Sequence, residues 1–399
     1  LEQNLFFLGP SFGQTQSQNC TQYQMRQQLG HFLYVADRPR SEFVVFNSNR
    51  MTVIERIAVP DPTSMAMGPN IDLLAISNQL ADTVTFVDIN PQSAQFHQVI
   101  RTVQVGNSPR GIAFEPTNED ILVCNELSNT MSIIAAATLD VRRTINSQLN
   151  RPFEVCVTPR MLGFSFQRGV YFAYALNRSG TVALFESGPN GVNGWGFDDV
   201  IGILPFDFQA PKQIQVDPIN LDGSVYVVHE GPIDVATGNP GNLGVGAISR
   251  LRIESAIAGQ IPLTQIGAGN ANFRDLQYGV PLSLSQSLGQ LSGIPVDIAF
   301  DNQRNLGGVP GPSNTFSAGS PIPANSKSSY RLIGGGGLNT SEPRFLFASV
   351  PNPIGGSGVI DVLALGVTGT PRFDTNPYVQ GIQSVPVPQV TILSDYWRQ

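Results

Sequence analysis

The chain repeats one unit, in which an apolar strand, a short polar turn and a second, alternating strand follow one another. The clearest copy consists of the apolar run 73–78, the turn 79–82 and the alternating run 83–88. Val, Ile, Phe and Thr dominate these runs, and Gly, Asn, Asp or Pro separate them, as is typical of strands and turns. No window of similar length has the spacing of a helix. Six such hairpins occur, at residues 32–47, 73–88, 121–134, 171–185, 225–253 and 344–363.

A short strand that opens with proline precedes most of these hairpins. Its clearest copy is the segment 108–116, and a third kind of run, such as 99–105, completes the unit. Proline is tolerated at the first residue of a strand. Further copies of the proline-led strand lie at residues 151–159, 210–218, 294–301 and, in degraded form, 61–67. The first five hairpins start about 40 to 54 residues apart, and four short strands in that length indicate a propeller blade.

Residues 73–114 contain the runs Leu-Leu-Ala-Ile-Ser-Asn, Asp-Thr-Val-Thr-Phe-Val-Asp and Ile-Arg-Thr-Val-Gln-Val-Gly-Asn-Ser-Pro-Arg-Gly-Ile-Ala-Phe. This stretch resembles the YVTN-type β-propeller repeat, and the resemblance extends over roughly residues 30–366. It implies an all-β propeller of four-stranded blades whose proline-led strands line a central channel. The resemblance favours seven blades, while the six hairpins leave six blades possible.

The rest of the chain divides into two parts around this repeat. We predict an N-terminal polar arm at residues 1–30, which docks on a neighbour, and a single propeller domain at residues 31–399. Gly, Pro, Ser and Asn-rich stretches predict long insertions around 256–292 and 302–343. The segment 388–393 resembles an inner strand, and we expect it to close the ring with the N-terminal hairpin, which has no obvious inner strand of its own.

Composition excludes some partners and favours others. The net charge is −7 and no basic run occurs, so no nucleic-acid partner is predicted. No apolar run approaches the ~20 residues of a transmembrane helix. Only 13% of the residues are charged, and Asn, Gln, Ser and Thr take their place. These features predict an extracytoplasmic protein, secreted, periplasmic or on the cell surface, with protein partners or self-assembly.

Few residues offer chemistry. The three cysteines are an odd number, which argues against a disulfide framework; Cys124 and Cys156 are interpreted as small buried apolar residues, with a bridge between them as the alternative. Of the three histidines, His31 and His97 are expected at the surface, and His229 is a weak functional candidate. No Cys-x-x-Cys-His haem site occurs, and neither a cofactor nor a metal site is predicted.

Two polar groups were candidates for a site. Asp198 and Asp199 are interpreted as a solvated turn, with an oxygen-ligand site as the alternative. The side chains that follow the strand-opening prolines should point to the mouth of the central channel. They are Arg110, Glu154, Lys212 and Asp297. This set of two basic and two acidic residues could bind a polar ligand or form a structural ring of ion pairs.

Two hypotheses for function follow. The first is a non-catalytic extracytoplasmic propeller that acts as a structural or protein-interaction module in a surface or multi-subunit assembly. The alternative is a propeller enzyme, lactonase-like or another hydrolase, or a haem-free subunit of a redox complex, with its site at the channel mouth. A metal or ordered ligand that contacts several of the four channel-mouth residues would favour the alternative, because a fold does not by itself decide function.

Overall fold

The structure is a computed structural model of the whole chain. The residues described below are 32–47, 52–70, 72–115, 118–158, 171–187, 198–203, 208–216, 225–233, 239–253, 276–278, 291–300, 344–351, 358–365, 371–373 and 384–386. The predicted arm at 1–30, most of the predicted insertions, the ring-closing segment 388–393, and both His31 and Cys20 lie outside these ranges.

The described residues form six antiparallel sheets, which we call blades 1 to 6 in chain order. The strands of blades 1 to 3 are β1 (Phe32–Asp37), β2 (Glu42–Asn47), β3 (Thr52–Ala58), β4 (Pro62–Met67), β5 (Leu73–Asn78), β6 (Thr83–Asp88), β7 (Val99–Gln104), β8 (Pro109–Phe114), β9 (Asp120–Asn125), β10 (Thr130–Ala135) and β11 (Asp140–Ile145). Those of blades 4 to 6 are β12 (Pro152–Val157), β13 (Phe172–Asn177), β14 (Val182–Glu186), β15 (Asp199–Ile203), β16 (Gln209–Val216), β17 (Val225–Glu230), β18 (Gly246–Ile253), β19 (Leu276–Tyr278), β20 (Asp297–Phe300), β21 (Arg344–Val350), β22 (Val359–Leu365), β23 (Pro371–Phe373) and β24 (Ser384–Pro386).

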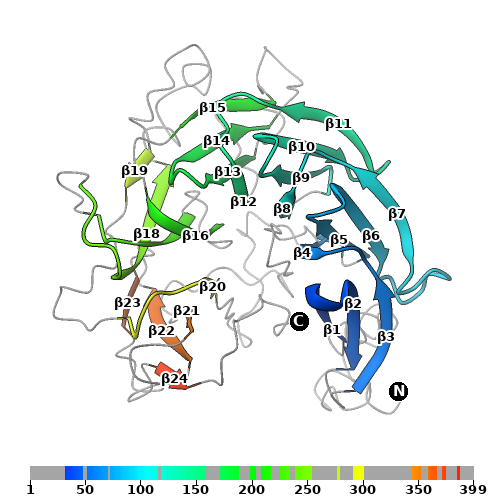
Figure 1. Ribbon diagram of the computed structural model, residues 1–399, viewed down its shortest axis with the longest axis horizontal. Helices are drawn as coiled ribbons and strands as arrows, with labels where there is room; N and C mark the ends of the chain where they lie inside the picture. Colours follow the sequence, from blue (N-terminus) through cyan, green and yellow to red (C-terminus); the bar gives the residue numbers. More distant parts are fainter. Residues whose placement is uncertain are drawn as a thin grey trace, which may run out of the picture.

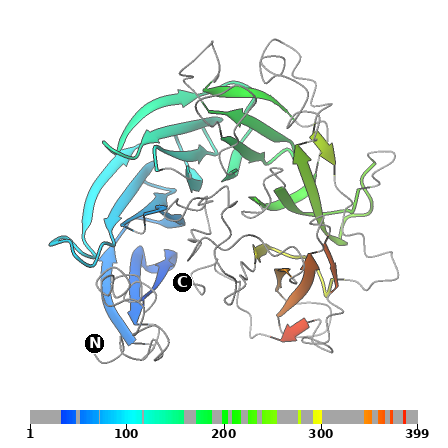
Figure 2. The ribbon, with the colours of Figure 1, turned by 180° about the vertical axis from the view of Figure 1, so that it is seen from behind.

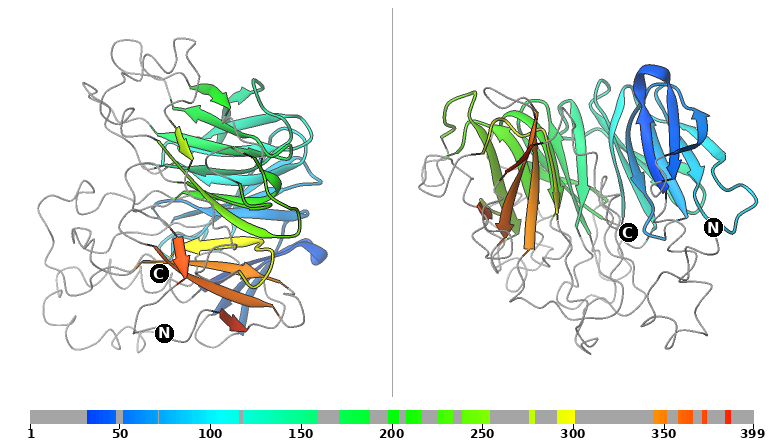
Figure 3. Two further views of the ribbon diagram at one scale, coloured as in Figure 1. Left: turned by 90° about the vertical axis from the view of Figure 1, so that its left-hand side faces the viewer. Right: turned by 90° about the horizontal axis from the view of Figure 1, so that it is seen from below.

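The blades stand around a central axis, with their sheets side by side (Figures 1, 2 and 3). The innermost strands are β4, β8, β12, β16 and β20, and four of these five contain the proline that opens the predicted inner strand or begin with it. The predicted all-β propeller of four-stranded blades is therefore confirmed. The described ranges contain one helical element, the 3₁₀ turn η1 (Arg38–Arg40), and none of their helices is long and apolar enough to span a membrane.

The two ends of the ring differ from the complete blades. Blade 1 has three strands in the described ranges, in the order β1-β2-β3, and it lacks a described counterpart of the inner strand, as the sequence predicts. In blade 6 both β23 and β24 pair with β22. The short β19 completes blade 5 from within the stretch interpreted as an insertion. A seventh blade would have to come from residues outside the described ranges.

Apolar cores lie between blades, and they explain why the second strands look uniformly apolar. In β9, Ile121 and Val123 pack with residues of blade 2, while Leu122 and Cys124 pack with residues of blade 4. Side chains alternate across a strand, so a blade that is covered on both faces needs apolar residues at every position. All six residues of β9 are buried, and the same holds for β13.

A buried amide ends the second strand of several blades. Asn78 Nδ2 donates to Thr83 Oγ1 and Thr85 Oγ1 at 2.9 and 2.7 Å, and Asn125 Nδ2 donates in the same way to Thr130 Oγ1 and Ser132 Oγ at 3.0 and 2.9 Å. In blade 4, Asn177 bonds to Thr181. Because a buried polar group must be hydrogen-bonded, the spacing Asn-x4-Thr-x-Thr/Ser of blades 2 and 3 couples the amide to two hydroxyls of the next strand, and the shorter spacing Asn-x3-Thr of blade 4 couples it to one.

Blade 5 has histidine where blades 2 to 4 have this asparagine. His229 pairs with Ala247 across the sheet, and its Nε2 lies 2.6 Å from Ser249 Oγ, two residues further along β18. Its Nδ1 lies 2.9 Å from the carbonyl oxygen of Glu230. The side chain is fully buried, and burial lowers the pKa of His229 to about 4. The structural role of the repeated position therefore explains this histidine.

His97 is buried, so its predicted surface position is wrong. Its ring stacks on Phe96 with centroids 3.7 Å apart and meets Phe32 edge-on at 4.9 Å. Its Nε2 lies 3.1 Å from Tyr34 Oη, which places it against blade 1. Burial lowers the pKa of His97 to about 4, against the smaller effect of the Asp88 charge. The surrounding loop is largely polar in sequence, but Phe32 and Tyr34, which help to cover His97, come from blade 1.

Left-handed residues occur at two repeated positions. The last turn residue before the third strand has positive φ at Ser41, Asp82 and Asn129. The residue before the strand-opening proline also has positive φ, at Asp61 (46°), Ser108 (57°), Arg151 (51°) and Ala210 (42°). Asn and Asp tolerate this conformation, whereas other non-glycine residues rarely adopt it. The entrance to each inner strand is therefore a conformationally costly position.

These two positions are tied to one another between neighbouring blades. Asp82 Oδ1 accepts a hydrogen bond from the backbone N–H of Ser108 at 2.7 Å, and Asn129 Oδ1 accepts one from the N–H of Arg151 at 2.8 Å. The Asp82 carbonyl also accepts from the N–H of Val105 at 2.9 Å. The turn of one blade thus holds the chain that leads into the inner strand of the next.

Residues of one blade also contact the inner strand of the next blade directly. Ser77 Oγ donates to the carbonyl oxygen of Arg110 at 2.7 Å, and Cys124 Sγ, at the same position of its strand, lies 3.6 Å from the carbonyl oxygen of Glu154. A Cβ on Gly111 would lie 2.5 Å from Glu154 Cα. Glycine at this position is therefore needed for the close approach of β8 and β12.

Ala210 offers a test of the left-handed entrance, because it is exposed and its side chain makes no hydrogen bond. Ala210→Gly should raise the free energy of unfolding by about 0.5–1 kcal/mol, since glycine adopts positive φ without a steric cost. Chemical denaturation measures the change. Ala58→Gly is the control: Ala58 is also exposed but lies within strand β3, where glycine should be destabilising. A lower stability for both variants would contradict the left-handed assignment.

The two buried histidines predict a loss of stability in mild acid. In the unfolded chain histidine titrates near 6.5, so below that pH the unfolded state takes up protons that folded His97 and His229 do not bind until about pH 4. Stability should fall as the pH decreases from 6.5 towards 4. His229→Asn should remove about 2 kcal/mol of the fall between pH 7 and pH 5, because asparagine keeps the bond and does not titrate. An unchanged pH profile in urea denaturation would refute this role.

Candidate functional site

One face of the ring carries the turns between the second and third strands of the blades and the entrances to the inner strands. We call it the turn face. It includes residues 38–41, 79–82, 126–129, 178–181, 231–233 and 239–245, together with the residues that precede the inner-strand prolines. The four channel-mouth candidates follow these prolines, so they lie next to this face.

The four candidates occupy two different positions of the repeat. Arg110 and Lys212 directly follow their prolines, whereas Glu154 and Asp297 come one residue later. Arg110 Nη1 pairs with Glu126 Oε2 at 3.3 Å, and Lys212 Nζ pairs with Glu230 Oε1 at 3.2 Å. These two ion pairs are equivalent, because each joins the residue after the proline to the first residue beyond the buried Asn or His of the same blade.

The two acidic candidates are placed deeper in the blades. Glu154 pairs across the sheet with Leu176, and its backbone packs against Gly111. Asp297 is buried, and its Oδ1 accepts a hydrogen bond from the backbone N–H of Ile298 at 2.9 Å. A second acceptor for that N–H is Gln213 Oε1 of blade 5, at 2.5 Å.

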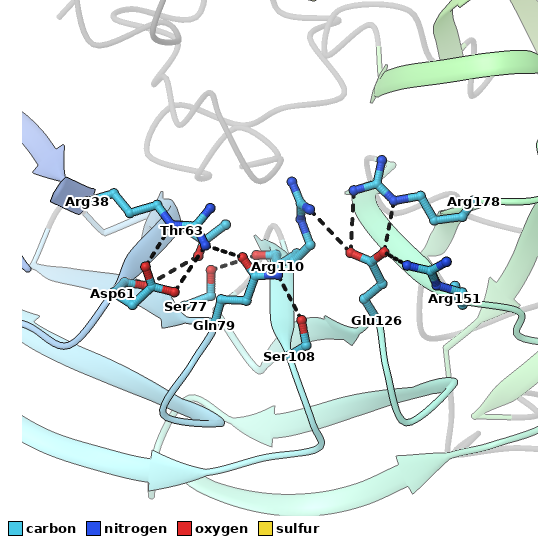
Figure 4. A network of polar contacts seen from close by, with 10 residues as sticks. All are labelled: Arg38, Asp61, Thr63, Ser77, Gln79, Ser108, Arg110, Glu126, Arg151 and Arg178. Carbon is cyan, nitrogen blue, oxygen red and sulfur yellow. Dashed lines mark hydrogen bonds and ion pairs between the residues drawn. The ribbon is translucent and has the colours of Figure 1, made fainter.

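Glu126 is the centre of a cluster of three arginines. Of this cluster the sequence predicts Arg110 as a site residue, but not Glu126, Arg151 or Arg178. The Glu126 carboxylate pairs with Arg110, with Arg151 Nη2 at 2.7 Å and with Arg178 Nε at 3.0 Å and Nη2 at 3.4 Å. Figure 4 shows Arg110 on one side of the Glu126 carboxylate and both Arg151 and Arg178 on the other. The Glu126 side chain is only 5% exposed. Burial alone would raise its pKa, but the three arginines outweigh burial and hold the pKa of Glu126 below its usual range.

Packing holds the arginine of blade 4 in place. The guanidinium carbon of Arg178 lies 3.8 Å from the centroid of the Phe153 ring, and Phe153 follows the strand-opening proline as Arg110 does in blade 3. This cation–π contact takes the place of the ion pairs of blades 3 and 5. The backbone N–H of Arg178 donates to the Arg151 carbonyl at 3.0 Å, so the two arginines are joined through the main chain as well.

A second polar chain connects blades 1 to 3 beside this cluster. Arg38 Nε donates to Asp61 Oδ1 and its Nη2 to Gln79 Oε1, both at 2.7 Å. Gln79 Nε2 donates to Ser108 Oγ at 2.9 Å. Arg38 is balanced by Asp61, so the positive excess of the turn face lies at the junction of blades 3 and 4.

Asp198 and Asp199 join blades at the outer rim, so their interpretation as a solvated turn is wrong. Arg142 of blade 3 contacts Asp198 at 2.6 and 2.8 Å and Asp120 at 2.7 and 2.9 Å. Arg143 Nη2 donates to Asp199 at 3.1 Å. Hydrogen bonds to Asp198 and Asp120 raise the pKa of Arg142 against the opposing effect of its burial. In the described part of the chain no group of three or more His, Cys, Asp or Glu residues is placed to hold a metal ion.

The two described cysteines are free and buried, as the interpretation as small apolar residues expects. Burial raises the thiol pKa of both Cys124 and Cys156. Because the thiolate is the reactive form of cysteine, neither thiol is placed for nucleophilic chemistry. Cys124 instead lies against the backbone of inner strand β12 in the next blade, as described above.

Comparison with known proteins supports the propeller fold. Residues 25–108, about a fifth of the chain, match the family model described as lactonase, 7-bladed beta-propeller. No curated protein matches the sequence. A chain of hydrazine synthase from Kuenenia stuttgartiensis is similar in structure with a TM-score of 0.50 and 15% identity, over 84% of this chain and 73% of that one. A chain of a mitotic checkpoint complex is less similar in structure, with a TM-score of 0.39 and 12% identity, over 57% of this chain and 59% of that one. The protein is a β-propeller.

Proposed function

We propose that this propeller is a non-catalytic interaction module that binds an acidic protein partner through its turn face. Its repeats are of the YVTN type, and it works in an extracytoplasmic surface or multi-subunit assembly. The low content of charged residues and the abundance of Asn, Gln, Ser and Thr support that location. The recurring Asn-x4-Thr spacing supports the repeat type.

The observation that carries this proposal is a set of exposed leucines on the turn face, one of which, Leu127, directly follows Glu126 of the arginine cluster. Leu80 and Leu127 are the second residues after the buried asparagines of blades 2 and 3, and they are 81% and 62% exposed. Leu243, in the corresponding turn of blade 5, is 64% exposed. Such turns normally carry Gly, Pro, Asn, Asp or Ser, so leucine at the tip of three turns is unusual.

Exposed apolar residues next to arginine match the composition of protein interfaces. The buried core of an interface is more apolar than the rest of a protein surface, and it is enriched in arginine and depleted in lysine. The cluster of Glu126 with Arg110, Arg151 and Arg178 has a charge of +2 on a chain whose net charge is −7. Complementary charge favours an acidic partner surface and excludes basic ones.

The leucines should be needed for binding and not for folding. A photo-reactive residue at position 127 should crosslink one acidic protein in extracts of the source organism, and one at position 54 on outer strand β3 should not. With that protein purified, Leu80→Ser plus Leu127→Ser should weaken binding at least tenfold, since two exposed side chains would leave an apolar contact. The melting temperature should be unchanged.

Val53→Ser plus Ile54→Ser is the matched control, because these side chains are 42% and 47% exposed on the perimeter of blade 1. The control should keep full affinity. Three results would contradict the proposal. They are equal crosslinking from positions 127 and 54, a second copy of this chain as the crosslinked protein, and an affinity for the partner that the leucine changes leave unaltered.

A second candidate function is a lactonase-like hydrolase, which the match of residues 25–108 to the lactonase family model favours. Its site would lie at the channel mouth with Arg110 and Glu154. The test is lactone hydrolysis by the full chain, with and without added divalent metal, followed by pH titration. Turnover that Arg110→Gln and Glu154→Gln abolish, with unchanged melting temperatures, would establish this function and overturn the non-catalytic assignment. We expect no hydrolysis above that of a heat-denatured sample.

A further inference from the structure

The cluster around Glu126 has more positive charge than its own carboxylate can balance. Three guanidiniums share one carboxylate, and the Arg110, Arg151 and Arg178 side chains are 30%, 54% and 32% exposed. The side chains are therefore held by a buried anion and still reach solvent. A group of this kind attracts a second anion from outside, because its charge is only partly compensated.

The arginines also keep hydrogen-bond donors for such an anion. A guanidinium has five N–H donors. Within the described residues, Arg110 uses one nitrogen towards Glu126, and Arg178 uses Nε and one terminal nitrogen. The guanidiniums of Arg110 and Arg178 extend from the blades on either side of the Glu126 carboxylate (Figure 4). Their remaining donors can converge on one group above Glu126.

The arrangement is held in place before any ligand binds. Arg178 stacks on Phe153 at 3.8 Å, and Phe153 is itself only 2% exposed. The backbone N–H of Glu126 donates to the Ser108 carbonyl at 2.9 Å. Side chains that are already ordered lose little conformational entropy on binding, which favours affinity.

The excess is local and is not a general property of the repeat. The equivalent positions carry Thr63 and Gln79 in blade 2, which are neutral, and Lys212 with Glu230 in blade 5, which balance. Among the described blades, only blade 3 has an arginine directly after the inner-strand proline, and this arginine, Arg110, lies next to arginines of the following blade. A single site on the ring is therefore expected.

We propose that Arg110 and Arg178, oriented by Glu126, bind a carboxylate of an acidic peptide segment. The planar guanidinium matches the two oxygens of a carboxylate, and Leu127 next to Glu126 provides an apolar contact for the same segment. The inference rests on the proposed function and deepens it, because it names the chemical group of the partner that the turn face recognises. Inorganic phosphate shares the oxyanion chemistry and is the competing ligand.

The test uses the full chain and a fluorescent hexapeptide of glutamate, with the matched glutamine peptide as the uncharged probe. Anisotropy at low and physiological salt should show binding of the glutamate peptide only. Arg110→Gln plus Arg178→Gln should weaken it at least tenfold, since two charge-assisted contacts are lost. Arg151 remains to pair with Glu126, so the fold should persist and the melting temperature reports on it.

The matched control changes the net charge by the same amount at the perimeter. Arg56 and Arg101 lie on outer strands β3 and β7, each paired with one carboxylate, Glu42 and Asp140. Arg56→Gln plus Arg101→Gln should change the affinity less than about twofold. Arg178→Lys should weaken peptide binding nearly as much as Arg178→Gln, because lysine keeps the charge but not the planar guanidinium fork.

Four results would overturn the inference. The first two are equal losses of affinity in both double variants and equal binding of the glutamine and glutamate peptides. The other two are an affinity that Arg178→Lys leaves unchanged, and displacement of the peptide by millimolar phosphate but not by citrate, which is a carboxylate competitor. The last would assign the site to a free phosphate group. The leucine variants separate this inference from the proposed function. If the arginine variant loses peptide binding while the leucine variant keeps its affinity for the partner, the carboxylate site stands and the protein-binding face does not. If the leucine variant loses affinity for the partner while the arginine variant keeps peptide binding, the protein-binding face stands and the carboxylate site does not.

Discussion

The contacts by which one blade holds the inner strand of the next are the constraint on which the remaining structure depends. A turn side chain, Asp82 or Asn129, accepts the N–H that precedes the inner-strand proline of the next blade. Gly111 then lets β8 approach β12 until a Cβ would no longer fit. These contacts set the spacing between blades, and with it the apolar cores that each blade shares with both neighbours.

The arginine cluster follows from that spacing. Arg110 is carried by blade 3 and Arg151 and Arg178 by blade 4. They meet at Glu126, in the blade 3 turn whose Asn129 accepts the N–H of Arg151. At the same positions, blade 5 carries a balanced ion pair, Lys212 with Glu230, and blade 2 carries the neutral residues Thr63 and Gln79. The propeller thus repeats one set of backbone contacts and varies the charge at its face, which fits recognition of a partner.

Local patterns in the sequence predict strands and inner strands well, because each blade is built from contacts between residues close in the chain. They fail where the partner belongs to another blade. His97 reads as a polar-loop residue, yet its cover is Tyr34 and Phe32 of blade 1. Asp198 pairs with Arg142, 56 residues away. Of the cluster, only Arg110 is predicted from sequence, by its place after proline. The turn position one residue after the buried asparagine is the signal that would have found Glu126 and Arg178, but not Arg151.

The central claim is that blades 3 and 4 together present two guanidiniums to an acidic partner. A crystal structure of the chain with a bound glutamate peptide tests it most directly. The account predicts a peptide carboxylate within hydrogen-bond distance of both Arg110 and Arg178, with Arg178 still stacked on Phe153 and Glu126 beneath. A peptide bound elsewhere on the ring, or arginines that have left Glu126 and do not contact the peptide, would contradict it.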